Sequence, residues 1–124
     1  MGTWTIDTSD EYDEWYENLD DKEKEDVLAA SLVLKTKGPG LGRPHVDTVS
    51  DSEHSNMKEL RVQHQGKPYR IFFAFDPNRN GILLCGGRKD GAGDKKFYEK
   101  EIKKADAIYS KHLKKLKEKK PGEK

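Results

Sequence analysis

Cysteine is nearly absent from this chain, and its scarcity excludes two kinds of site. The one cysteine, Cys85, has no second thiol to pair with, so an internal disulfide and a zinc site built from cysteines are both excluded. No cysteine–histidine pairing supports a thiol nucleophile. Cys85 ends the apolar run ILLC, and we therefore expect it to lie in the core.

Long apolar runs and targeting signals are missing as well. The longest apolar stretches are only a few residues, too short to span a bilayer. Residues 1–20 are acidic and lack the basic region and apolar core of a secretion signal. We therefore expect a cytoplasmic protein with no membrane association.

The common motifs for nucleotides and metal ions are also lacking. There is no Walker loop and no GxGxxG sequence. His45 and His54 lie in a loop with Asp47, Asp51 and Glu53, but this spacing is not typical of metal ligands. We expect neither a metal ion nor a cofactor.

Apolar residues are scarce overall, yet the aromatic ones are well placed. Hydrophobic residues make up 32% of the chain and charged residues 38%, a balance toward the disordered end. The aromatic residues nevertheless fall inside segments with helical or strand periodicity, which indicates a folded core. The sequence predicts one domain over residues 1–119 and a mobile tail over residues 120–124.

The net charge of +1 hides a strong asymmetry between the two ends of the chain. Residues 1–34 carry 11 acidic and 2 basic side chains, whereas residues 35–124 carry 22 basic and 12 acidic ones. Such polarity favours an anionic partner on the basic side, often a nucleic acid. The alternative is two solvated faces of opposite charge that only keep the protein soluble.

The order of predicted elements is β-α-α-β-β-β-α, an α+β fold. The short connections between the last three strands favour antiparallel pairing, with the first strand at an edge. The segment 41–56 is expected to be a loop, and a further short strand that includes Val46 and Val49 is an open alternative. The second helix is expected to bury Val27, Leu28, Ala30, Leu32 and Leu34. The predicted strands are 3–7, 57–64, 69–75 and 82–88, and the predicted helices are 10–19, 21–37 and 95–119.

Arg70 is the first candidate for chemistry, because it interrupts the apolar strand YRIFFAF. A buried guanidinium needs a partner, and two interpretations stay open. It forms a structural ion pair with Glu59 or Asp76, or it binds a phosphate group through its planar fork.

Further candidates follow on the neighbouring segments. Arg88 and Lys89 come after Gly86-Gly87, where a ligand or another part of the chain can approach the backbone closely. Tyr98 opens the last helix and either packs in the core or points at a cleft, where it stacks on a base or transfers a proton if cations lower its pKa. His64 is a candidate general acid or base, or an inert histidine. Further cations expected to contact RNA are Arg61, Lys58, Lys67, Lys95 and Lys96.

Three segments together resemble a known family. The strand KELRV, the strand YRIFFAF and the ending ILLCGGRKDG…FYEKEIKKAD are similar in order and spacing to the RelE/HigB superfamily of bacterial toxin–antitoxin toxins, in its phage-derived HigB-like branch. The resemblance covers about residues 3–113. It implies an antiparallel sheet packed against N-terminal helices and a C-terminal helix, the RelE-like fold.

The resemblance also implies an activity. Members typically cleave messenger RNA in the ribosomal A site without a metal ion, by attack of the 2′-hydroxyl on the adjacent phosphate. By position, Arg70 matches the arginine that contacts the scissile phosphate, Arg88 with Lys89 the basic pair after the last strand, and Tyr98 the C-terminal tyrosine. Arg61 matches an arginine that is often structural. A partner antitoxin of helix-turn-helix type is implied.

Two alternatives to this activity stay open. A ParE-like toxin would share the fold but inhibit DNA gyrase without catalysis. An inactive phage-derived relative would bind only its antitoxin.

Overall fold

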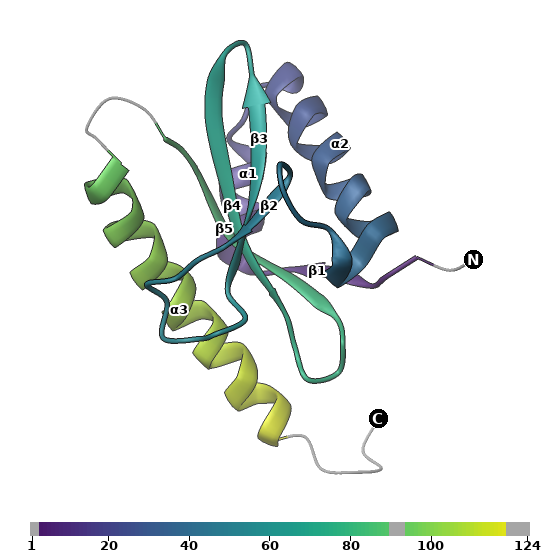
Figure 1. The fold of residues 1–124 in the computed structure, drawn as a ribbon, viewed down its shortest axis with the longest axis vertical. Helices are drawn as coiled ribbons and strands as arrows, with labels where there is room; N and C mark the ends of the chain where they lie inside the picture. The colour runs from purple at the N-terminus through teal and green to yellow at the C-terminus, as the bar shows by residue number, and fades with distance from the viewer. Residues whose placement is uncertain (1–2, 90–93, 119–124) are drawn as a thin grey trace.

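A five-stranded sheet with helices on both faces forms the framework of the protein (Figure 1). The computed structural model describes residues 3–89 and 94–118, so the tail predicted over residues 120–124 lies outside the described residues. The strand order is β1-β5-β4-β3-β2. The strands are β1 (Ile6–Thr8), β2 (Val46–Thr48), β3 (Lys58–His64), β4 (Lys67–Phe75) and β5 (Gly81–Arg88), and the α-helices are α1 (Asp10–Glu17), α2 (Asp21–Lys37) and α3 (Asp94–Glu118).

The three long strands predicted from the sequence form the centre of the sheet. β3, β4 and β5 are antiparallel neighbours, as expected from their short connections. Gln65 and Gly66 join β3 to β4 with φ angles of 53° and 77°, the left-handed conformation of a tight hairpin turn. This turn fixes a register in which His64 lies opposite Lys67.

Two short strands complete the sheet at its edges. The first strand lies at an edge of the sheet, as predicted, and β1 pairs with β5 in parallel, in a sheet that is otherwise antiparallel. The physical reason is the long stretch of chain between these two strands, which leaves room for a crossover. β2 pairs antiparallel with β3 at the other edge and includes Val46, whereas Val49 follows the strand.

The two N-terminal helices begin at capping residues. Ser9 caps α1 by accepting from the backbone N–H of Tyr12, and Asp20 caps α2 in a reciprocal capping box with Glu23. Both helices end close to their predicted limits. Within the described ranges, no helix combines the length and apolarity needed to cross a bilayer.

Alternate residues of β4 pack in two separate hydrophobic cores, one on each face of the sheet. Tyr69, Ile71 and Phe73 pack on the face covered by α1 and α2. Phe72 and Ala74 pack on the face covered by α3. A strand buried on both faces explains the nearly continuous apolar run YRIFFAF. Cys85 is buried in the α3-side core, as predicted.

The prediction for the buried side of α2 was partly wrong. Val27 and Leu34 are 1% and 0% exposed and face the sheet, but Leu28 and Leu32 are 50% and 52% exposed. Residues seven positions apart lie almost above one another after two helical turns, whereas Leu28 and Leu32 lie farther round the helix. The helix therefore has a second, uncovered apolar side.

Candidate active site

An ion pair between β3 and β4 lies at the centre of the α3 face. Nε of Arg70 lies 3.6 Å from Oε1 of Glu59, and Nη1 of Arg70 donates to the carbonyl oxygen of Tyr69 at 3.0 Å. Both charged side chains are nearly buried, at 10% and 6% exposure. Of the two partners considered for Arg70, Glu59 is the observed one, because Asp76 instead contacts His112 at 2.8 Å.

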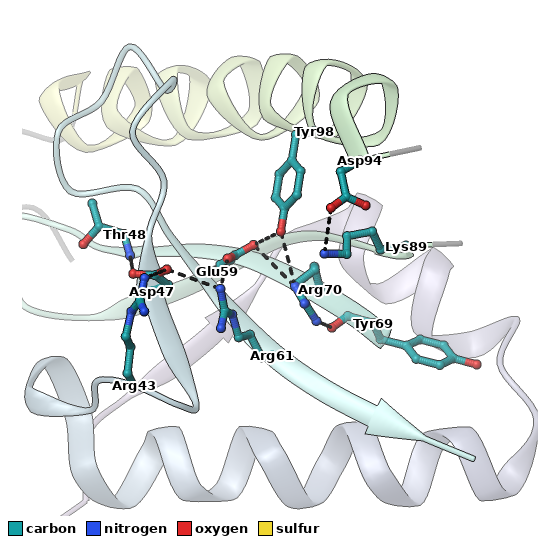
Figure 2. A network of polar contacts seen from close by, with 10 residues as sticks. All are labelled: Arg43, Asp47, Thr48, Glu59, Arg61, Tyr69, Arg70, Lys89, Asp94 and Tyr98. Atoms are coloured by element: carbon teal, nitrogen blue, oxygen red, sulfur yellow. Dashed lines mark hydrogen bonds and ion pairs between the residues drawn. The ribbon is translucent and has the colours of Figure 1, made fainter. Parts of the chain in front are cut away.

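Tyr98 reaches the same ion pair from the first turns of α3. Its hydroxyl donates to Oε1 of Glu59 at 2.7 Å and accepts from Nε of Arg70 at 3.3 Å (Figure 2). Its ring packs edge-on against Phe72. Tyr98 thus belongs both to the core and to the polar site, the two interpretations that the sequence left open.

The surroundings of Tyr98 raise the pKa of its phenol. Burial raises the pKa of Tyr98 above 10.0, the hydrogen bond to Glu59 raises it further, and the nearby Arg70 opposes both with a smaller effect. Burial and Glu59 therefore outweigh Arg70, the pKa of Tyr98 lies above its usual value, and the phenol is neutral at physiological pH. Tyr98 acts here as a hydrogen-bond donor.

Arg61 extends this site toward the sheet edge. It lies directly opposite Arg70 in the ladder, and its Nη2 lies 3.4 Å from Oε2 of Glu59 and 3.3 Å from Oδ2 of Asp47. Asp47 in turn pairs with Arg43 at 2.9 Å, and this contact is the main reason why the pKa of Asp47 lies below its usual value. The charges alternate in sign along the chain of contacts that Figure 2 shows.

Lys89 approaches the site from the end of β5. Its Nζ lies 5.6 Å from the centre of the Tyr98 ring and 3.4 Å from Oδ2 of Asp94. The backbone N–H of Lys89 donates to the carbonyl of Pro68 at 2.8 Å, which ties this residue to β4. The structure therefore brings together Arg70, Tyr98 and Lys89 from the predicted catalytic set.

A cavity of about 640 Å³ opens beside Glu59 and Tyr98. Its walls come from the end of β2, the segment that follows β2, and α3. The lining carries more carboxylates than ammonium groups. Its charged residues are Asp51, Glu59, Asp94, Lys95, Glu99, Lys103 and Asp106.

Two predicted catalytic residues lie on the opposite face of the sheet. Nδ1 of His64 lies 2.6 Å from Oδ2 of Asp26 on α2. Arg88 is the cross-strand neighbour of Tyr69, whose hydroxyl donates to Glu23 of α2. The structure does not bring His64 or Arg88 to the group around Glu59.

The other predicted RNA-binding cations are spread out. Lys58 reaches the Thr48 hydroxyl at 3.5 Å, and Lys67 is exposed at the start of β4. Lys95 lines the cavity, whereas Lys96 is exposed on the same helical turn outside its lining.

The glycine pair at the end of β5 serves the packing of the chain itself. A Cβ added at Gly86 would meet Trp15 of α1 at 2.6 Å, and one added at Gly87 would meet Phe97 of α3 at 3.1 Å. Close approach of the backbone was predicted, and the approaching groups are side chains from the two sides of the sheet.

Glu59 is the residue whose role the sequence reasoning missed. It was considered only as an ion-pair partner of Arg70, yet it contacts Arg61, Arg70 and Tyr98 together. A usable signal was present, because Glu59 and Arg61 are two residues apart on a strand and so share one face. Among the described residues, no group of three or more potential ligands is placed to hold a metal ion.

The arrangement defines the class of protein. A five-stranded, mostly antiparallel sheet between two N-terminal helices and one C-terminal helix is an α+β fold of the RelE-like class. The polar site lies between the sheet and the C-terminal helix, where Arg70, Glu59 and Tyr98 meet.

Comparison with known proteins gives the family. Residues 14–110 match the family described as "Phage derived protein Gp49-like (DUF891)", and the chain belongs to this family. It is 44% identical over 119 residues to "Putative toxin HigB2" of Mycobacterium tuberculosis, covering 95% of this chain and 58% of that protein. It is 47% identical over 92 residues to "Putative toxin HigB3" of the same organism, covering 74% of this chain and 78% of that protein. The resemblance to HigB-like proteins is thereby confirmed, while this chain spans little more than half the length of the first relative.

Proposed function

We propose that this protein is the toxin of a type II toxin–antitoxin system and that it cleaves messenger RNA on the ribosome. The names of the relatives support the toxin class, and the similarity of the strand and helix motifs to the RelE/HigB superfamily supports the reaction. One observation carries the chemistry. The carboxylate of Glu59 contacts both the Arg70 guanidinium and the Tyr98 hydroxyl at the wall of an open cavity.

Glu59 is the proposed general base. In the proposed reaction, the ribose 2′-oxygen attacks the adjacent phosphorus as the bond from phosphorus to the 5′-oxygen breaks, and a 2′,3′-cyclic phosphate is left. The 2′-hydroxyl proton passes to Glu59, which accepts protons only as the ionised carboxylate. Contacts with Arg61 and Arg70 hold the Glu59 carboxylate in place on the sheet.

Arg70 is the proposed stabiliser of the charge that develops on the phosphorane. Its described hydrogen bonds use Nε and Nη1, and a guanidinium carries further N–H donors that can bind phosphate oxygens. The carbonyl of Tyr69 holds the guanidinium in place before substrate binds. Donors fixed in advance in a poorly hydrated site stabilise a transition state more than mobile ones do.

Lys89 and Tyr98 complete the proposed set. The leaving 5′-oxygen requires a proton, which Lys89 supplies from its ammonium group, held by Asp94 near the Tyr98 ring. Tyr98 keeps its own proton and orients the Glu59 carboxylate through their hydrogen bond. The neutral phenol thus positions the base and does not act as one.

The acidic lining of the cavity suits a nucleobase of the RNA better than a phosphate group. Carboxylates such as Asp51 and Glu99 accept hydrogen bonds, and the amino groups of adenine, cytosine and guanine donate them. A nucleobase in this cavity would lie beside Tyr98, while the phosphate of the same nucleotide would lie toward Arg70 and Lys89.

The proposal includes partners that the resemblance implies. They are translated messenger RNA, the ribosomal A site, and an antitoxin of helix-turn-helix type that is encoded by a neighbouring gene. The place of action is the cytoplasm, and no metal ion takes part in the reaction as written.

The test is to induce the protein in cells while mapping RNA 5′ ends, translation and DNA supercoiling. Codon-positioned cuts with wild-type protein, lost with Glu59→Gln, would support the proposal. Glu14→Gln is the matched control, because Glu14 is exposed on α1, which packs on the other face of the sheet. Altered supercoiling without RNA cuts would favour gyrase inhibition, and unaffected growth would favour an inactive relative.

A further inference from the structure

An uncovered apolar groove lies on the face of the sheet opposite the candidate active site. It runs between α1 and α2 and has a volume of about 320 Å³. Leu28 and Leu32 of α2 form one wall, and each is about half exposed, at 50% and 52%. The lining also includes Ile6 of β1, Tyr12 and Tyr16 of α1, and Leu83 of β5.

The two leucines differ from an isolated exposed apolar residue. They are four positions apart and therefore lie one above the other on the same side of the helix. Side chains of α1 continue the apolar surface across the groove. Contiguous exposed apolar surface of this kind marks an interaction site more often than scattered single residues do.

The charges on the rim indicate what covers the groove. Asp13 lines it from α1, and Asp21 and Glu25 extend the line of the two leucines toward the start of α2. All three of these side chains are exposed. Lys35 is the cation at the other end of the groove. A complementary partner would carry apolar side chains along one side, basic residues at one end and an acidic residue at the other.

The neighbouring backbone favours a helix as the occupant. The N–H of Trp4, just before β1, donates to the carbonyl of Lys35 at 2.9 Å, so part of the edge beside β1 is already closed by α2. The ridge that Leu28 and Leu32 form on α2 matches the grooves on another helix. The stretch of α2 from Asp21 to Lys35 is on the order of 20 Å long, enough for a partner helix of about four turns.

A second copy of this face is a poor occupant. The first 34 residues carry 11 acidic and 2 basic side chains, and a two-fold contact would place two such acidic surfaces together. We propose instead that the α1–α2 groove is the docking site of the antitoxin, which covers Leu28 and Leu32 with a basic amphipathic helix. The identity of this partner rests on the proposed function.

The test measures binding of the purified antitoxin, the protein encoded beside this chain, to the full-length protein by calorimetry. The double variant Leu28→Glu/Leu32→Glu is expected to weaken binding by about tenfold or more, because both leucines lie at the centre of the contact. Val33→Glu is the matched control, since Val33 is also exposed, at 39%, but is not among the residues that line the groove. Wild-type binding should weaken as salt rises.

The outcomes separate this inference from the proposed function. Unchanged affinity in the double variant, an equal loss in Val33→Glu, or no binding of that protein by the wild type would overturn the docking site. Dimerisation of the wild type that is lost in the double variant would also overturn it, in favour of self-association. If the wild type binds through the leucines but never cleaves RNA, the docking site stands and the proposed activity fails.

Discussion

Arg61 of β3 and Arg70 of β4 lie directly opposite each other in the antiparallel ladder. Like charges in this position repel and destabilise the pairing of two strands. Glu59 offsets the repulsion, because its two carboxylate oxygens contact the two guanidiniums at 3.4 and 3.6 Å. The carboxylate that we propose as the base therefore also holds the two strands together.

Removal of Glu59 should destabilise the protein through the two arginines. We expect Glu59→Ala to lower the free energy of unfolding by roughly 3 kcal/mol, because it leaves a buried guanidinium without its counter-ion. Adding Arg61→Ala should recover part of this loss. Urea unfolding of the wild type, both single variants and the double variant measures the coupling. Purely additive effects would contradict the bridging role of Glu59.

Tyr98→Phe should slow cleavage without changing its pH dependence. Burial and Glu59 raise the pKa of the phenol, so its proton is present throughout the neutral range. Loss of the hydroxyl is expected to lower the rate about tenfold, because Glu59 loses the donor that orients it. Rates for both proteins should follow curves of the same shape between about pH 6 and pH 9. A limb of the wild-type curve that vanishes in the variant would show that Tyr98 titrates during catalysis.

The contact between Tyr69 and Glu23 should make the free energy of unfolding depend on pH in the acidic range. The Tyr69 hydroxyl holds the pKa of Glu23 below 4.5 in the folded protein. A lowered folded-state pKa contributes stability above the unfolded value, and this contribution is lost as the pH falls through the folded-state pKa. Tyr69→Phe should therefore destabilise most near neutrality, and the difference from wild type should shrink below about pH 4.

Urea unfolding at a series of pH values tests whether the stability difference between Tyr69→Phe and wild type shrinks as the pH falls. Glu23→Gln is a useful companion variant, because glutamine can keep the capping box with Asp20 while removing the charge. A difference between Tyr69→Phe and wild type that grows on acidification would be inconsistent with the account.

Gly86 should not tolerate a side chain. A Cβ at this position would lie 2.6 Å from the Trp15 ring, so we expect Gly86→Ala to lower the free energy of unfolding by about 2 kcal/mol. Gly42→Ala serves as the control, since a Cβ there would meet nothing within 4 Å. Thermal and urea unfolding give the comparison, and equal stability of the two variants would refute the packing argument.

Much of the fold could be predicted because local signals agreed with one another. Ser9 and Asp20 are residue types that cap helices, and turn-forming residues such as Gly66 separate the long strands, so these signals coincide with the observed element boundaries. The parallel pairing of β1 with β5 could not be predicted, since it depends on contacts between residues more than 70 positions apart. The exposure of Leu28 and Leu32 was missed for a related reason. Periodicity shows that a helix has apolar residues, but not how much of its circumference the sheet covers.

The site was predictable in part. Arg70 stood out because a charge inside an apolar strand requires a partner, and Tyr98 because it opens the last helix. Counting from the tight turn at Gln65-Gly66 places Arg61 opposite Arg70, so the turn also indicates the register of these two strands. The same strand alternation puts Arg88 and Lys89 on different faces, so only Lys89 reaches Tyr98. His64 and Arg88 were grouped with the others by type of chemistry rather than by face.

The most direct test of the account is single-turnover cleavage of a defined messenger RNA on purified ribosomes by wild-type protein, Glu59→Gln and Glu14→Gln. We expect Glu59→Gln to lower the rate by about a hundredfold or more while it stays folded by circular dichroism. Glu14→Gln should cleave at close to the wild-type rate, because Glu14 is exposed on α1 and does not line the cavity. The wild-type 5′ fragment should end in a 2′,3′-cyclic phosphate. Cleavage by Glu59→Gln at the wild-type rate would contradict the central claim that Glu59 takes the proton from the attacking hydroxyl.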